Sequence, residues 1–284
     1  TPYQMLQPAP LLGRLVPETG AMRLVAGIVL ATLLNPVELA ENAATVDILS
    51  GGRFVLGVGL GYRDEENHAF GIFERRIETM LGKVDVVRRL LEGEAVTAEG
   101  PGYRLDSQRL ELRPVQKPRP PIWLAANNDA AVERAARHAD TWLVNPHSTV
   151  DELERQVRLF RAARGSDADE LPVIREVCVR ATDDEAVAVA RPFLDKKYQA
   201  YVDWGQSEVM PPTDSLRKEW DDLRRGRFLL GGPETVAAQI RRTVQRLEAT
   251  EVVFRLQWPG MPPQEAMRSL TLLIDDVLPR LRGI

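Results

Sequence analysis

The segment NPVELAENAATVDILSGGRFVLGVGLG, residues 35–61, sets the pattern of the whole chain. Asn35 and Pro36 supply an N-cap and a proline at the first helical position, so a helix begins here and ends before the glycine pair at 51–52. The run RFVLGVG, 53–59, then has the length and the apolar content of a buried strand. A helix that leads into a buried strand is one step of the alternation that builds a parallel α/β sheet.

The same alternation extends over the rest of the chain. Thr-x-x-Glu capping boxes at Thr149 and Thr182 mark the starts of two of its helices. Because a closed (β/α)8 barrel needs eight strand–helix units, we predict one TIM-barrel domain over residues 1–284 that lacks the first strand, the first helix and the second strand. Six strands, each followed by a helix, are predicted at 22–30, 53–59, 121–126, 141–145, 172–181 and 251–258.

Three longer segments interrupt the alternation. Residues 60–73 form a long loop after the second predicted strand, and residues 94–120 predict a hairpin excursion that ends in an extended linker. Residues 203–230 are irregular and rich in Pro, Asp and Arg, which predicts an insertion at the rim of the barrel. Long connections after barrel strands commonly act as binding loops or lids.

Composition excludes several classes of function. The 37 lysines and arginines are interleaved with 41 acidic residues, so no basic stripe is available for nucleic acid. The longest uncharged apolar run, 24–34, is much shorter than the ~20 residues that span a bilayer. Cys178 is the single cysteine, no His/Cys cluster has metal-ligand spacing, and no secretion signal is visible. We therefore expect a cytoplasmic protein without a metal site or a membrane span.

Two motifs at strand ends have the chemistry of a cofactor site. The glycines of GVGLG, 57–61, are spaced differently from a dinucleotide-binding fingerprint; at a barrel rim they leave room for a flat ring, or they serve tight strand packing. In AANNDAA, 125–131, Asn127, Asn128 and Asp129 stand at a helix start, where backbone N–H groups favour a phosphate. Simple N-capping by Asn128 or Asp129 is the competing interpretation.

Candidates for general acid–base chemistry are few. Of the three histidines, His147 follows a predicted strand end and is the strongest candidate for a base. Gln257 and Trp258 close the last strand, where the indole either walls a ring-shaped ligand or packs in the core. The pattern places Arg175 and Glu176 near the start of their strand, which favours a structural role.

Three segments in order, 35–66, 120–142 and 230–254, resemble the luciferase-like monooxygenase superfamily. The resemblance implies a TIM-type barrel that binds FMN or the deazaflavin coenzyme F420. It further implies a non-prolyl cis peptide bond at Gly27–Ile28, behind the flavin. The implied cofactor-contacting positions are Gly27, Ile28, Gly59, Leu60, Gly61 and Tyr62 for the ring, and Ala126, Asn127, Asn128 and Asp129 for the phosphate loop.

The resemblance predicts a monooxygenase that oxidises a small organic substrate with reduced FMN from a separate flavin reductase. The alternatives are an F420-dependent oxidoreductase that transfers a hydride, for which Arg63 and Arg104 are candidates to bind the acidic tail, and a non-catalytic flavin-binding protein. The family's histidine-bearing loop is not in this sequence, so no catalytic residue carries over. Tyr62 is a further candidate beside His147, and a homodimer is a further expectation.

Overall fold

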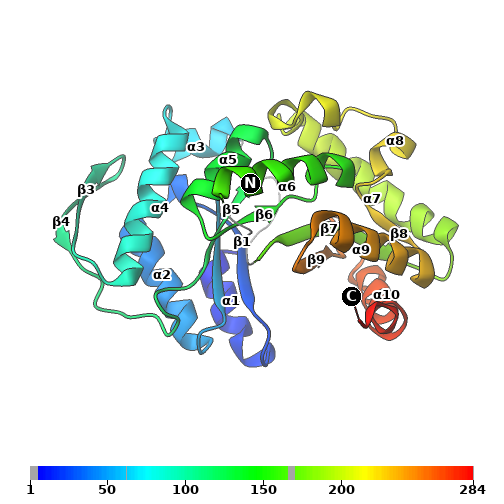
Figure 1. The fold of residues 1–284 in the computed structure, drawn as a ribbon, viewed down its shortest axis with the longest axis horizontal. Coiled ribbons are helices and arrows are strands. Elements are labelled where there is room, and N and C mark those ends of the chain that lie inside the picture. Colours follow the sequence, from blue (N-terminus) through cyan, green and yellow to red (C-terminus); the bar gives the residue numbers. More distant parts are fainter. Residues whose placement is uncertain (1–5, 62, 166–169, 284) are drawn as a thin grey trace. The chain divides into compact units, whose positions relative to one another are not determined.

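The computed structural model describes residues 6–61, 63–165 and 170–283. The chain divides into two compact units, each with its own strands and helices (Figure 1). The first unit comprises residues 1–125 together with 137–141, and the second comprises 126–136 together with 142–284.

The first unit is built on three parallel strands. β1 (Leu24–Leu30) pairs with β2 (Phe54–Gly59), and β2 pairs with β5 (Ile122–Ala126). β2 is buried along its whole length. This agrees with its sequence of apolar residues and glycines, which is typical of a parallel strand covered on both faces. The helices of this unit are α1 (Pro8–Leu15), η1 (Val16–Glu18), η2 (Ala31–Leu33), α2 (Pro36–Leu49), α3 (Asp64–Ala69) and α4 (Arg76–Glu92).

An antiparallel hairpin stands outside the parallel strands of this unit. β3 (Val96–Gly100) pairs with β4 (Tyr103–Gln108) within the segment 94–120. In Figure 1 the hairpin lies on the outer side of α4, against which β3 packs. The segment 60–73 contains the short helix α3, which the sequence pattern did not indicate.

The second unit is organised around β7 (Pro172–Val179). This strand pairs in parallel with β6 (Thr141–Val144), with β8 (Leu229–Gly231) and with β9 (Glu251–Arg255). Its helices are α5 (Asp129–His138, whose last two residues count with the first unit), α6 (Val150–Arg164), α7 (Asp183–Asp203), η3 (Ser207–Val209), η4 (Pro212–Asp214), α8 (Trp220–Arg224), α9 (Pro233–Leu247), α10 (Pro263–Leu272), η5 (Leu273–Val277) and η6 (Leu278–Leu281).

The predicted strands and helix starts are present in the described part of the chain. All six strands are found, and the three-residue strand β8 is an addition that the sequence did not predict. The predicted caps form as side-chain oxygens that accept backbone N–H groups: Asn35 from Val37 at 2.9 Å, Thr149 from Glu152 at 3.3 Å and Thr182 from Glu185 at 3.2 Å. Among the described residues, no helix is long and apolar enough to cross a membrane.

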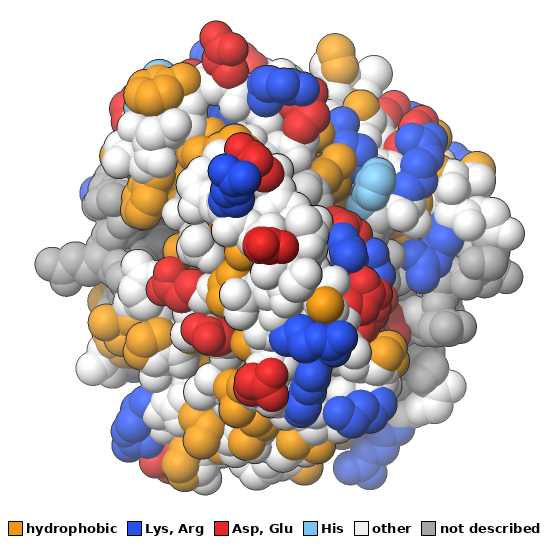
Figure 2. All heavy atoms as spheres, turned by 90° about the vertical axis from the view of Figure 1, so that its left-hand side faces the viewer, with side chains coloured by type: hydrophobic (Ala, Val, Ile, Leu, Met, Phe, Trp, Pro, Cys, Tyr) orange, Lys and Arg blue, Asp and Glu red, His pale blue; other side chains and the backbone are white. Residues whose placement is uncertain are grey.

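Basic and acidic side chains interleave on the face of the molecule shown in Figure 2. Along α4, for example, Arg88 lies 2.6 Å from Asp85 and 3.2 Å from Glu92. Exposed pairs of this kind contribute little to stability. They do neutralise one another, so opposite charges are interleaved over the described part of this face.

Candidate functional site

The ends of β1 and β2 carry predicted cofactor residues. The peptide bond between Gly27 and Ile28 is cis, at the position that the resemblance implies, and the register of β1 on β2 shifts between Ala26 and Val29. Gly27 is exposed, whereas Ile28 is half-buried and Gly59 is buried. Because Gly27 is exposed and has no side chain, its backbone leaves room for a planar ring to approach.

A buried hydrogen-bonded link holds the turn that follows β2. The Lys83 ammonium of α4 donates to the Thr32 carbonyl at 2.6 Å, and the Thr32 hydroxyl donates to the Leu60 carbonyl at 3.4 Å. Lys83 is only 4% exposed, and its burial lowers its pKa. The link fixes Leu60 next to Gly61, whose φ of +73° is one that glycine adopts readily. Tyr62 lies outside the described residues.

The loop 126–129 at the end of β5 forms the start of α5. The Asn128 carboxamide oxygen accepts the Ala131 N–H at 3.0 Å, and its nitrogen donates to the Val209 carbonyl at 3.3 Å. The Asp129 carboxylate pairs with Arg155, which lowers the pKa of that carboxyl. Asn128 therefore acts as the N-cap that the sequence offered as the competing interpretation. Asn127 is half-buried, and its backbone carbonyl accepts a hydrogen bond from the Gln156 side chain at 3.3 Å.

A buried charge cluster centres on Glu176, which is fully buried in β7. Its Oε1 accepts from the Lys197 ammonium at 2.5 Å and from the Arg255 guanidinium at 3.2 Å. Its Oε2 accepts the indole N–H of Trp258 at 2.6 Å. Burial lowers the pKa of Lys197 to about 8, although the Glu176 carboxylate opposes that shift. Trp258 is thus a buried member of this cluster, while its neighbour Gln257 is exposed.

His147 lies in the loop after β6, in the same unit. The Asn145 side chain accepts the His147 N–H at 2.8 Å and donates to the Ala126 carbonyl at 3.0 Å, which fixes the loop. The imidazole packs edge-on against Tyr201, with ring centroids 4.7 Å apart, and against Tyr198 at 5.9 Å. Its pKa is well below the ordinary value, chiefly because the ring is buried and further because cations surround it. The imidazole is therefore neutral at physiological pH, whereas the most efficient general bases have a pKa near the working pH.

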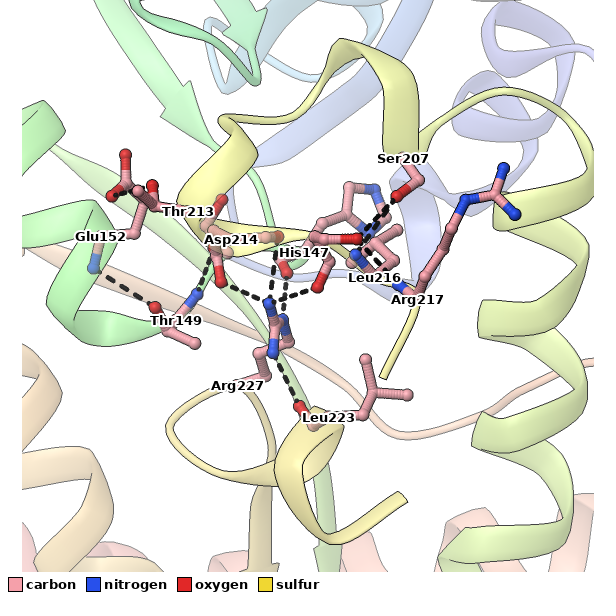
Figure 3. Close-up of polar contacts among 12 residues, drawn as sticks. His147, Thr149, Glu152, Ser207, Thr213, Asp214, Leu216, Arg217, Leu223 and Arg227 are labelled. Carbon is pink, nitrogen blue, oxygen red and sulfur yellow. Dashed lines mark hydrogen bonds and ion pairs between the residues drawn. The ribbon is translucent and has the colours of Figure 1, made fainter. Parts of the chain in front are cut away.

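Arg227 is hydrogen-bonded to this loop (Figure 3). Its guanidinium donates to the His147 carbonyl at 2.8 Å and forms a fully buried ion pair with Asp214. The other Asp214 oxygen accepts the Thr149 N–H at 2.9 Å. Two residues of the segment 203–230, which was predicted as a rim insertion, therefore hold the loop after β6. Arg227 binds the carbonyl of His147, and Asp214 binds the N–H of Thr149.

We predict that His147 makes the protein less stable in acid. Because its pKa in the folded chain is depressed, the unfolded chain takes up a proton first, and the stability present above pH ~6.5 is lost as the pH falls. The slope is at most about 1.4 kcal/mol per pH unit. Urea unfolding at a series of pH values below 7 should show that His147→Gln flattens this slope. The exposed His138→Gln is the control, and an unchanged slope in His147→Gln would contradict the prediction.

The sequence indicated His147 and Trp258 but missed most of the cluster. It placed Arg175 and Glu176 near the start of their strand and gave them a structural role; they lie in the middle of β7, and the role stays a prediction. The two are successive residues of β7, so they point to opposite sides. Arg175 donates to the Ser148 carbonyl beyond the end of β6 at 3.1 Å, and Glu176 reaches Trp258 beyond the end of β9. The available signal was a charged pair inside an otherwise apolar strand.

Comparison with known proteins places the chain among α/β-barrel proteins. The structure of the monooxygenase RslO1 from Streptomyces bottropensis is similar, with a TM-score of 0.82, 24% identity, and 96% of this chain and 82% of that chain covered. The FMN complex of the oxygenating constituent of 3,6-diketocamphane monooxygenase from Pseudomonas putida is also similar. Its TM-score is 0.76 and its sequence identity is 17%, with 96% of this chain and 83% of that chain covered. The coenzyme F420-dependent tetrahydromethanopterin reductase from Methanopyrus kandleri has a TM-score of 0.72 and a sequence identity of 20%, with 98% of this chain and 88% of that chain covered.

These likenesses show the fold, a luciferase-like barrel architecture in which parallel strands alternate with helices. The family model described as luciferase-like monooxygenase matches residues 1–251. The chain belongs to the luciferase-like monooxygenase family. The resemblance seen in the sequence is thereby confirmed, and with it the assignment to a family of oxidoreductases.

Proposed function

We propose that the protein is a flavin-dependent monooxygenase that uses reduced FMN, supplied by a separate flavin reductase, to oxygenate a small organic substrate. The match of the luciferase-like monooxygenase model over residues 1–251 is the observation that carries this proposal. When bound, the flavin supplies the redox chemistry, and the protein supplies binding, orientation and exclusion of water. Few ionisable protein groups are then required, in keeping with a chain that has three histidines.

The proposed flavin contacts form two sets of residues, each considered by itself. Exposed Gly27 and half-buried Ile28 offer a surface for the ring, together with Gly59, Leu60 and Gly61. The start of α5 offers backbone N–H groups at Asn127, Asn128 and Asp129 for the phosphate. His147 is the proposed base, and Gln257 and Trp258 remain proposed contacts of the substrate.

The FMN assignment is preferred to F420 because of charge at the proposed rim. The acidic tail of F420 needs free cations, and Arg63 is already engaged by Glu66 at 3.2 Å and Glu65 at 3.8 Å. Arg104 is exposed on the β3–β4 hairpin. Among proteins of similar fold, both an FMN complex and an F420-dependent reductase occur, so the alternative has to be tested directly.

The decisive assay supplies the protein with reduced FMN from a purified reductase, heavy-isotope oxygen and a panel of small organic acids, ketones and aromatics. Mass spectrometry should find a product that carries one labelled oxygen atom. Reduction of F420 with members of the same panel, without labelled product, would instead establish hydride transfer. Flavin binding without either product would favour a non-catalytic flavin-binding protein.

The phosphate loop can be tested with Asn128→Asp. The new carboxylate keeps the N-cap to Ala131 and complements the helix dipole but loses the hydrogen bond to the Val209 carbonyl, so we expect the unfolding free energy to fall by about 1 kcal/mol. The added negative charge should weaken FMN binding at least several-fold. Fluorescence titration should show that riboflavin, which has no phosphate, is unaffected. Equal FMN affinities in the variant and the unmodified protein would remove this loop from the site.

A further inference from the structure

Arg175 is a fully buried cation that has no carboxylate partner in the described part of the chain. Its Nη1 donates to the Ser148 carbonyl at 3.1 Å. Its Nε and Nη2 meet no acceptor among the described residues. These two nitrogens form one edge of the guanidinium, the edge that recognises oxyanions in a bidentate fashion. Leaving such a group unpaired in the interior costs several kcal/mol, so its retention calls for a binding partner.

The nearby carboxylates are committed to other cations. Glu176 is held by Lys197, Arg255 and Trp258. Asp214 is held by Arg227 and by the backbone N–H of Thr149. Four buried or half-buried cations, Arg175, Lys197, Arg227 and Arg255, therefore face two carboxylates. Independently of this balance of charge, burial lowers the pKa of Arg175 to about 10 and that of Lys197 to about 8.

The loop residue that Arg175 contacts, and the residue before it, also carry buried polar atoms without a described partner. The Ser148 hydroxyl is fully buried and has no hydrogen-bond partner among the described residues. The same holds for Nδ1 of His147, whose side chain is 9% exposed. Ser148 is in direct contact with Arg175 through its carbonyl, and the Asn145 side chain holds the N–H groups of both loop residues, at 2.8 and 3.1 Å.

We propose that Arg175, Ser148 and His147 form an oxyanion-binding site, and that the oxyanion is an acidic group of the substrate, such as a carboxylate, a sulfonate or a phosphate ester. The inference rests on the proposed function, since it names the substrate class of that reaction. A guanidinium edge, a hydroxyl and an imidazole nitrogen together supply the donors that such a group accepts. The same chemistry fits the phosphate of the flavin itself, so the test separates these two sources.

Sulfate is the probe for the site. Calorimetric titration of the full-length protein with sodium sulfate, with ionic strength held constant by sodium chloride, should show saturable binding. We expect Arg175→Gln to weaken it at least tenfold and Ser148→Ala to weaken it several-fold. Arg191→Gln, which changes an exposed arginine of α7 paired with Asp195, is the matched control and should bind as the unmodified protein does. Absence of saturable binding, or equal binding in Arg175→Gln, would overturn the proposal.

Thermal unfolding shows whether the variants are folded, so that loss of sulfate binding is not mistaken for loss of structure. Because Arg175→Gln removes an unbalanced buried charge, the variant should unfold at an equal or higher temperature without sulfate, and sulfate should raise the midpoint of the unmodified protein only. The Ser148→Ala change provides a second, conservative readout. A sulfate-dependent rise of the same size in Arg175→Gln would contradict the assignment.

Titrating sulfate in the presence of saturating FMN distinguishes the sources of the oxyanion. Simultaneous binding of both assigns the site to the substrate, as proposed. Competition between sulfate and FMN, with loss of the preference for FMN over riboflavin in Arg175→Gln, would give the site to the flavin phosphate and overturn the substrate assignment. Because sulfate binding is measured without flavin as well, failure of the proposed function alone leaves that result intact.

Discussion

Replacing Glu176 by glutamine should destabilise the protein by about 3–5 kcal/mol, the typical cost of breaking a buried ion pair from one side. The carboxylate is fully buried, and it accepts hydrogen bonds from Lys197 at 2.5 Å and from Trp258 at 2.6 Å. Without its charge, Lys197 and Arg255 face each other in the interior without compensation. Urea unfolding at pH 7 measures the loss.

The same cluster should also make the stability of the protein depend on pH, through Lys197. The pKa of Lys197 in the folded protein is about 8, below its ordinary value of 10.5, so the unfolded chain binds more protons between those two values. Stability from this group should therefore rise with pH from about 8 to about 10.5. Lys197→Met should abolish the rise and should rescue part of the loss in Glu176→Gln. A Glu176→Gln protein as stable as the unmodified one would show that the cluster is not formed.

The second large effect is expected at Gly57 in β2. A Cβ atom on this residue would lie 2.3 Å from the carbonyl oxygen of Ala26, which is backbone of the paired strand and has no freedom to turn away. Gly57→Ala should destabilise the protein by about 3 kcal/mol, as overpacking in a core commonly does. Denaturant unfolding measures the change, and equal stability would mean that β1 and β2 are not packed as described.

Two other glycines calibrate this result. Gly82→Ala in α4 places its Cβ 3.6 Å from the Tyr103 hydroxyl and should stabilise the helix by ~0.5–1 kcal/mol. Gly59→Val places its Cβ 2.1 Å from Cδ1 of Ile28, the mobile end of a side chain. We expect Gly59→Val to displace Ile28 and to reduce flavin affinity more than it reduces stability.

Local chemistry explains which parts of the fold were predictable from sequence. Capping at Asn35, Thr149 and Thr182 involves residues two or three positions apart, so the helix starts could be read directly. The strand β8 could not, because three residues carry no periodicity and this strand exists through its pairing with the end of β7. The position of the cis bond at Gly27–Ile28 came from the family resemblance and not from local pattern.

The buried cluster shows the limit of sequence reasoning for the site. The contacts of Glu176 with Lys197, Arg255 and Trp258 join residues 21, 79 and 82 positions apart, and no spacing rule connects them. The signals in the sequence were a charged pair within an apolar strand and Trp258 at the end of another strand. Of the predicted cofactor residues, Gly27 at β1 is exposed and Gly59 at the end of β2 is buried. The side chains of Asn128 and Asp129 already have protein partners.

The measurement that tests the central claim most directly is an anaerobic fluorescence titration of the full-length protein with reduced FMN, compared with oxidised FMN and with F420. The account predicts saturable binding of reduced FMN that is tighter than that of either other ligand, and weaker binding of FMN to Asn128→Asp. Failure of the folded protein to bind reduced FMN, or tight binding of F420 alone, would contradict it.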